Sequence, residues 1–149
     1  MAAGPSGHVL KLMLRYEARS AADPATAWSL VAEPARWQEW SPHLRGAWGL
    51  GEGEVERGAR GAARLLGVVP IPARVTAVSQ GHSWTWSVGP MELDHRVDPD
   101  TDGAGGSIVG VDIRAAPAVE AVLRFTYGPV VAVLVRNLAR VAGQKALGP

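Results

Sequence analysis

The sequence predicts an α+β fold in which an antiparallel sheet is followed by a long C-terminal helix. Apolar and polar residues alternate over residues 8–20, and short β-compatible runs separated by Gly, Pro, Asp and Ser clusters fill residues 41–115. Helical periodicity then continues from about residue 116. The 149 residues are expected to form one domain, residues 1–149. A domain of this length buries about 68–70% of its unfolded surface, which is enough to enclose a cavity.

The N-terminal part is expected to form one strand and two short helices. The alternation over residues 8–20 is typical of a half-buried strand. Asp23 can cap a helix that begins at Pro24, and Pro34 can begin a second short helix. Two short helices are therefore predicted between the first and second strands.

The middle of the chain is expected to form an antiparallel meander, because each β-compatible run ends in turn residues. The six strands predicted there are residues 44–50, 60–66, 71–79, 82–89, 91–98 and 107–115.

The C-terminal segment has an apolar stripe at helical spacing, which predicts one long helix with a buried face. Pro129 removes a backbone donor inside this helix, and Gly128 weakens the same place. We therefore expect a kink at Gly128–Pro129.

Composition excludes several classes of protein. Hydrophobic residues make up 47% and charged residues 19% of the chain, as in globular proteins. The fifteen basic residues are scattered and nearly balanced by fourteen acidic ones, so that the net charge is +1, which argues against nucleic-acid binding. The absence of cysteine excludes disulfides, thiol chemistry and thiolate metal sites. With no targeting signal and no apolar run long enough to cross a bilayer, we expect a cytoplasmic protein without stable membrane insertion.

A survey of motifs predicts neither a metal nor a nucleotide cofactor. The segment "DPDTDG" matches four positions of an EF-hand loop, but Val109 stands where a bidentate Glu is needed. We interpret it as a polar hairpin turn. "GLGEGE" lacks the third glycine of a dinucleotide fingerprint, and neither a phosphate loop nor a nucleophile elbow occurs.

The order of elements and several segments resemble a known family. The segments are "DPATAW", "PARWQEWSPH", "WTWSVGP" and "YGPVVAVLVRNLARVA". In this order they resemble the START-like helix-grip superfamily, also called SRPBCC, and within it the polyketide cyclase/dehydrase and lipid-transport group. The resemblance covers residues 8–145. It implies a seven-stranded antiparallel sheet wrapped around the long C-terminal helix, with an elongated apolar cavity between them.

The segment "HSWTWSVG" places Trp84 and Trp86 on one face of a strand. In a helix-grip fold this face meets the C-terminal helix, so the two rings are either solid core or the wall of a ligand cavity. Small side chains on the 60–66 strand would leave space for a ligand. The residues expected to line the cavity and bind a ligand are Leu12, Leu14, Tyr16, Trp28, Ala63, Trp84, Trp86, Met91, Leu93, His95, Val111, Leu123, Tyr127 and Val131.

Three functions remain open at this point. The first is binding or transport of a hydrophobic small molecule of lipid, polyketide or isoprenoid type. The second is a polyketide cyclase/dehydratase enzyme that uses the same cavity, and the third is an interaction module. Fold resemblance alone does not choose among them. The expected partner is a hydrophobic ligand, and the expected oligomeric state is a monomer or a weak dimer.

Two candidate catalytic residues bear on the enzyme hypothesis. His95 is the best acid/base candidate because it lies on an otherwise apolar strand face. Family cyclases resemble one another in carrying an inward arginine, and Arg74 is the nearest candidate here. Its direction stays open because two apolar alternations, through Val75 and through Val78, compete. Binding is favoured, because only His95, Tyr16 and Tyr127 are ionisable on the inward faces.

Overall fold

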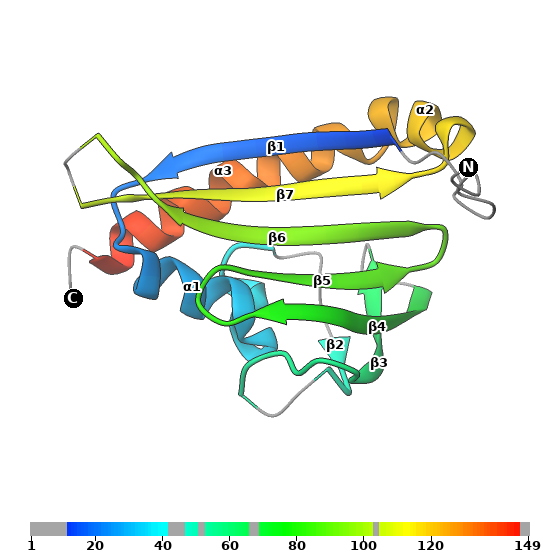
Figure 1. The fold of residues 1–149 in the computed structure, drawn as a ribbon, viewed down its shortest axis with the longest axis horizontal. Coiled ribbons are helices and arrows are strands. Elements are labelled where there is room, and N and C mark those ends of the chain that lie inside the picture. The colour runs from blue at the N-terminus through cyan, green and yellow to red at the C-terminus, as the bar shows by residue number, and fades with distance from the viewer. Residues whose placement is uncertain (1–11, 42–46, 51–52, 66–68, 103–104, 147–149) are drawn as a thin grey trace, which may run out of the picture.

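The computed structural model describes residues 12–41, 47–50, 53–65, 69–102 and 105–146. It has the predicted α+β fold, in which one antiparallel sheet packs against a C-terminal helix (Figure 1). In chain order the elements are β1 (Leu12–Ser20), α1 (Pro24–Ala32), the 3-10 helix η1 (Pro34–Glu39), β2 (Ala47–Trp48), β3 (Arg60–Leu65), β4 (Val69–Ser79), β5 (Ser83–Val88), β6 (Met91–Pro99), β7 (Ser107–Ala115), α2 (Pro117–Phe125) and α3 (Gly128–Ala146).

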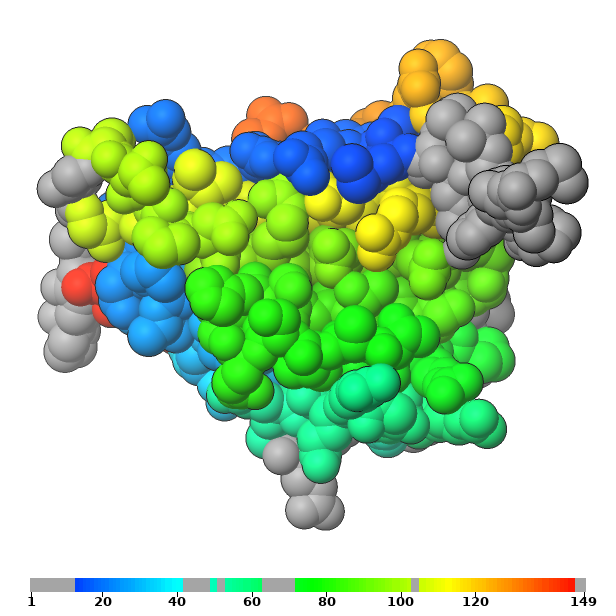
Figure 2. Space-filling view, viewed as in Figure 1, coloured from blue at the N-terminus to red at the C-terminus, as the bar shows by residue number. Residues whose placement is uncertain are grey.

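The strands follow the order β1-β7-β6-β5-β4-β3-β2, and all neighbours are antiparallel. From β2 to β7 each strand pairs with the next one in sequence, so the predicted meander is present. β1 pairs with β7 and forms the edge of the sheet opposite β2. Figure 2 shows side chains of β1, β7, β6, β5 and β4 forming one continuous outer surface, with α3 on the opposite side of the sheet.

Six of the strands are six to eleven residues long, whereas the predicted strand 44–50 is reduced to the two residues of β2. Gly49 explains where β2 ends. It has a φ of +79°, a left-handed conformation that interrupts an extended strand. A Cβ at this position would also lie 2.6 Å from the carbonyl oxygen of Arg60, so the chain passes close to β3 there. Residues 42–46 lie outside the described part of the chain.

The two short helices begin where the sequence predicts. The Asp23 carboxylate accepts hydrogen bonds from the backbone N–H of Thr26 (3.3 Å) and from its hydroxyl (2.6 Å). Pro24 and Pro34 begin α1 and η1, where a missing N–H costs nothing. Trp37 of η1 and Trp40, which follows it, line the cavity described below, and both indoles donate hydrogen bonds to the end of α1.

The C-terminal segment forms two helices rather than one kinked helix. α2 and α3 are bent by 63°, and the break falls at residues 126–127, just before the predicted Gly128–Pro129. Pro129 is the second residue of α3, where its missing donor leaves no gap in the helical hydrogen bonds. It therefore helps to begin a new helix. The space where a Cβ of Gly128 would lie is occupied by the hydroxyl of Tyr16.

Within the described residues, no single helix has the length and apolar character needed to span a membrane. Only α2 and α3 taken together pass that test, and they are sharply bent.

The outer face of the sheet carries a buried ion pair. Arg96 on β6 donates to both carboxylate oxygens of Asp112 on β7, at 3.0 and 3.1 Å. Arg15 on β1 reaches the same carboxylate at 3.3 Å. This network ties β1, β7 and β6 together on the side opposite the apolar core.

Candidate functional site

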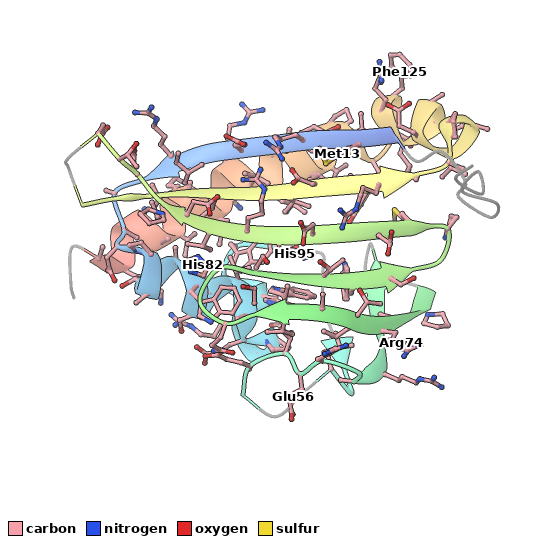
Figure 3. The ribbon with its side chains drawn as sticks, viewed as in Figure 1. Met13, Glu56, Arg74, His82, His95 and Phe125 are labelled. Atoms are coloured by element: carbon pink, nitrogen blue, oxygen red, sulfur yellow. The ribbon has the colours of Figure 1, made fainter. Side chains whose placement is uncertain are left out.

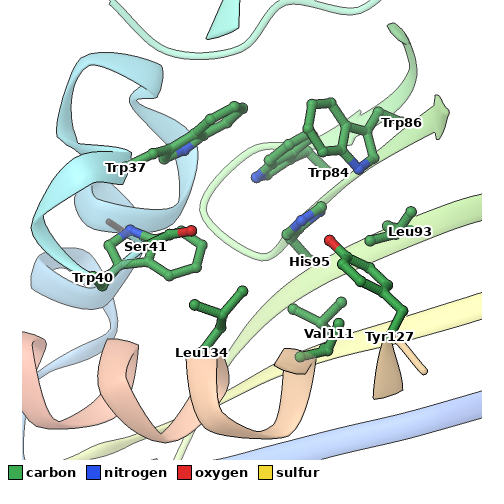
Figure 4. Close-up of a pocket in the computed structure, with 11 residues that line it drawn as sticks. Trp37, Trp40, Ser41, Trp84, Trp86, Leu93, His95, Val111, Tyr127 and Leu134 are labelled. Atoms are coloured by element: carbon green, nitrogen blue, oxygen red, sulfur yellow. The ribbon is translucent and has the colours of Figure 1, made fainter. Parts of the chain in front are cut away.

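A cavity lies between the inner face of the sheet, η1 and the beginning of α3 (Figure 4). Its volume is about 30 Å³, taken as the space open to the centres of water-sized molecules. This is room for roughly two waters. The eleven residues that line it are Trp37, Trp40, Ser41, Trp84, Trp86, Leu93, His95, Val111, Tyr127, Val131 and Leu134. None of these eleven is an Asp, Glu, Lys or Arg.

Strand register places the sheet residues of this wall in a row. Trp84 on β5 lies opposite His95 on β6, which lies opposite Val111 on β7. Directly paired residues of an antiparallel sheet point to the same face. Trp86 lies opposite Leu93 in the same way. The regular alternation of β5 and β6 is therefore what turns these side chains toward α3.

Four aromatic rings pack closely in this wall. Trp84 is stacked between Trp37, at 5.4 Å and 4°, and His95, at 4.0 Å and 5°. The ring of Trp86 stands nearly perpendicular to all three, with centroid distances of 5.4 to 5.8 Å. Parallel stacking and edge-to-face contact are both favourable arrangements of aromatic rings.

The end of α1 holds three of the four tryptophans in place. The indole N–H groups of Trp37 and Trp84 both donate to the carbonyl oxygen of Val31, at 2.9 and 3.0 Å. The indole of Trp40 donates to the carbonyl of Leu30 at 2.9 Å. Carbonyls in the last turn of a helix have no partner within the helix, so they can accept these bonds.

Three buried polar atoms around the cavity have no hydrogen-bond partner among the described residues. They are Trp86 Nε1, His95 Nδ1 and Ser41 Oγ. Leaving a buried donor or acceptor unpaired costs about 1–3 kcal/mol, and most such groups in folded proteins are paired. Figure 4 shows His95 and Trp86 toward one side of the cavity, and Ser41 beside Trp40 at the other. The apolar wall of the cavity therefore contains unpaired hydrogen-bonding atoms, which are closed to solvent in this structure.

Burial also keeps this wall uncharged. It lowers the pKa of His95 to about 4, and the nearby backbone of Trp84 and the charge of Asp112 offset this only in part. Burial raises the pKa of Tyr127 to about 12. At neutral pH both groups are therefore neutral.

Arg74 does not join His95 at this site. Its side chain is exposed, and β5 lies between its strand and that of His95 (Figure 3). The register of β4 against β5 shifts between Val75 and Ala77, so a β-bulge reverses the alternation at Thr76. Val75 is buried before the bulge and Val78 is partly buried after it. Arg74 lies before the bulge and faces outward, which contradicts an inward arginine here.

Seven residues expected at the cavity lie around it: Trp84, Trp86, Leu93, His95, Val111, Tyr127 and Val131. Five others lie elsewhere in the structure: Leu14, Tyr16, Trp28, Met91 and Leu123. The hydroxyl of Tyr16 packs at Gly128, and the indole of Trp28 donates to Glu54 at 3.1 Å. The side chains of Leu12 and Ala63 are outside the described part. A role of any of these residues in ligand binding stays a prediction.

Sequence reasoning missed Trp37, Trp40, Ser41 and Leu134. The sequence does indicate that three of these side chains are buried. Trp37 and Trp40 are three residues apart in a predicted short helix, and Leu134 belongs to the apolar stripe of the C-terminal segment. Nothing in the spacing, however, indicates that η1 folds back over β5.

The described residues contain no group of three or more His, Asp or Glu side chains that could hold a metal ion. In the "DPDTDG" segment, Asp100 and Asp102 form ion pairs with Arg19, at 3.7 and 3.1 Å. Residues 103–104 of that turn lie outside the described part.

Comparisons with known proteins agree with this architecture. A family model described as polyketide cyclase / dehydrase and lipid transport matches residues 13–145. No curated protein sequence matches.

Solved structures from several bacteria share the fold. A Thermobifida fusca protein determined by solution NMR has a TM-score of 0.72 at 18% identity, covering 89% of this chain and 93% of that one. A START superfamily protein from Mycobacterium smegmatis has a TM-score of 0.64 at 16% identity, covering 91% and 97%. A Staphylococcus saprophyticus protein has a TM-score of 0.65 at 11% identity, covering 86% and 89%. At such identities the likeness is one of fold.

Proposed function

Because this chain belongs to the polyketide cyclase/dehydrase and lipid transport family, we propose that it binds a hydrophobic small molecule between the sheet and α3. One observation carries the proposal: a buried, uncharged and largely aromatic cavity retains polar atoms without partners. Small-molecule sites typically combine an apolar wall with a few polar groups that fix orientation.

Binding has more support than catalysis. An efficient general acid or base has a pKa near the working pH, whereas His95 titrates at about 4. Arg74 is exposed on the outer side of the sheet and supplies no charge to the cavity. A cyclase or dehydratase would need a second oriented group to stabilise an enolate, and the charged residue types that commonly do this are missing from the eleven lining residues.

Binding of a ligand larger than about two waters requires movement of the α3 side of the cavity, because its volume is only about 30 Å³. Tyr127 and Leu134 are only partly buried, while the other nine lining residues are buried. Tyr127 lies at the joint between α2 and α3. Outward displacement of these two side chains would enlarge the cavity without breaking the sheet.

Native mass spectrometry tests the proposal directly. We expect part of the purified protein to carry a non-covalent adduct, above the 15.7 kDa of the chain, that organic extraction releases. Titration with N-phenyl-1-naphthylamine, a neutral apolar fluorophore, should quench tryptophan fluorescence in a saturable way.

A matched pair of variants locates the site. Leu134→Trp would fill the cavity from α3 and should abolish probe binding. Val133→Trp adds the same ring at the preceding, exposed position and should leave binding unchanged. Equal binding by both variants, or no saturable binding by the unmodified protein, would contradict the proposed function.

A further inference from the structure

We propose that the ligand is a neutral, compact aromatic molecule with a hydroxyl group, which binds between Trp86 Nε1 and His95 Nδ1. This inference rests on the proposed function and adds to it the chemistry that selects the ligand.

The two nitrogen atoms belong to neighbouring rings. Trp86 and His95 are in edge-to-face contact, with centroids 5.8 Å apart. Both residues are more than nine-tenths buried, and both line the cavity. Neither Trp86 Nε1 nor His95 Nδ1 has a partner among the described residues. The other three cavity indoles already donate to the end of α1, so Trp86 supplies the one unused indole donor of the wall.

The chemistry of these atoms favours a hydroxyl group. The indole Nε1–H can only donate, whereas Nδ1 of a neutral imidazole donates or accepts according to its tautomer. A hydroxyl oxygen can accept from Trp86 while its hydrogen is donated to His95. If His95 carries its proton on Nδ1, the same oxygen can accept from both rings. A hydroxyl therefore satisfies the pair in either tautomer.

Among the described residues the cavity wall carries no charge, which favours a neutral molecule. None of the eleven lining residues carries a charge at neutral pH, so a carboxylate or an ammonium group would enter without an opposite charge. Burying an unpaired charge is strongly unfavourable. Free fatty acids are therefore expected to bind less well than alcohols or phenols of equal size.

Size and shape favour a ring over a long chain. The cavity has room for roughly two waters before it opens, so each added carbon requires further displacement of α3 side chains. A single ring can meet the edges of the surrounding indoles, which is a favourable contact. In the free protein neither polar atom is open to solvent, so the side-chain movement that admits the ligand must also expose Trp86 Nε1 and His95 Nδ1 to its hydroxyl group.

Three probes of equal ring size separate the possibilities: 4-ethylphenol, ethylbenzene and 4-ethylbenzoate. Titrations followed by NMR of the indole N–H signals give the affinity of each and show which indole is contacted. We expect 4-ethylphenol to bind about two- to tenfold more tightly than ethylbenzene, the range for one net neutral hydrogen bond, and to shift the Trp86 N–H signal. We expect 4-ethylbenzoate to bind most weakly.

Trp86→Phe removes the donor and keeps an aromatic ring, so the preference for the phenol should fall toward one. His95→Phe should reduce it in the same way. Trp28→Phe is the matched control, because the Trp28 indole lies outside the cavity and its N–H donates to Glu54. That variant should keep the preference even if it is less stable.

The outcomes distinguish this inference from the proposed function. Equal affinity for 4-ethylphenol and ethylbenzene in the unmodified protein would overturn the hydroxyl site while leaving hydrophobic binding intact. Tightest binding of 4-ethylbenzoate would overturn the requirement for a neutral ligand. If none of the three probes binds and the naphthylamine also fails, the proposed function itself is wrong. The comparison of probes needs no variant, so it remains decisive if Trp86→Phe does not fold.

Discussion

Replacing Trp84 or Trp86 by alanine should destabilise the protein to different extents. Trp84 is 1% exposed, stacks on two rings and donates a hydrogen bond to Val31. Truncating a buried tryptophan costs roughly 3–5 kcal/mol, and the lost hydrogen bond adds about 1 kcal/mol. We expect about 4–6 kcal/mol for Trp84→Ala, a large part of the ~5–15 kcal/mol that stabilises a domain.

Trp86 is buried to a similar degree, at 3% exposed, but its N–H has no partner and it borders the cavity. Trp86→Ala should therefore cost about 3 kcal/mol, near the lower end of the range for a buried tryptophan. Removing an unpaired buried donor also relieves part of its desolvation penalty. The difference between the two variants should be about 1–3 kcal/mol.

Urea unfolding followed by far-ultraviolet circular dichroism measures this difference without relying on tryptophan fluorescence. Phe125→Ala is the control, because Phe125 is 80% exposed and its loss should change the free energy of unfolding by less than about 0.5 kcal/mol. If Trp84→Ala does not fold, the milder pair Trp84→Phe and Trp86→Phe keeps the comparison. A larger loss at Trp86 than at Trp84 would refute the assignment of Trp84 to the anchored core and of Trp86 to the cavity wall.

Three further predictions follow from particular contacts. Arg74→Ala should leave both unfolding free energy and probe binding unchanged, to within about 0.5 kcal/mol, in urea melts and fluorescence titrations; a loss of binding would return Arg74 to the site. His95 has a pKa of about 4 in the folded protein and about 6.5 in the unfolded chain, so the unfolded chain takes up the proton first as the pH falls. The free energy of unfolding should therefore decrease by up to about 3 kcal/mol as the pH drops from about 6.5 to about 4. His95→Phe should flatten that part of the profile, and an unchanged slope would argue against the buried imidazole. Gly128→Ala should lower the melting temperature because its Cβ meets the Tyr16 hydroxyl, and Tyr16→Phe should partly restore it; simple additivity of the two changes would contradict this contact.

Regular local patterns were enough to predict much of the fold and part of the cavity wall. Asp23 and Pro24 predict the beginning of α1 because the capping interaction is local in sequence. Trp84, Trp86 and His95 could be placed on one face because β5 and β6 alternate without interruption. In each case the information lies within a few residues of the position predicted.

Where the backbone departs from regular geometry, the prediction was left open or misplaced. In β4 the apolar alternation through Val75 holds before the bulge at Thr76, and the alternation through Val78 holds after it. Only the register with β5 shows where the change occurs. Pro129 was expected to bend a continuous helix, yet it lies at the second position of a new one. Either outcome is compatible with the same local sequence.

The properties that distinguish this cavity depend on contacts between distant segments. Val31 and Trp84 are far apart in sequence, yet the carbonyl at the end of α1 accepts the Trp84 indole and also that of Trp37. Once these donors are used there, Trp86 is the cavity tryptophan whose N–H has no partner among the described residues, and it lies beside His95, whose Nδ1 has none there either. Strand alternation treats Trp84 and Trp86 as equivalent inward residues. The hydrogen bond from Trp84 to the end of α1 makes Trp84 an anchor of the wall and leaves Trp86 able to select a ligand.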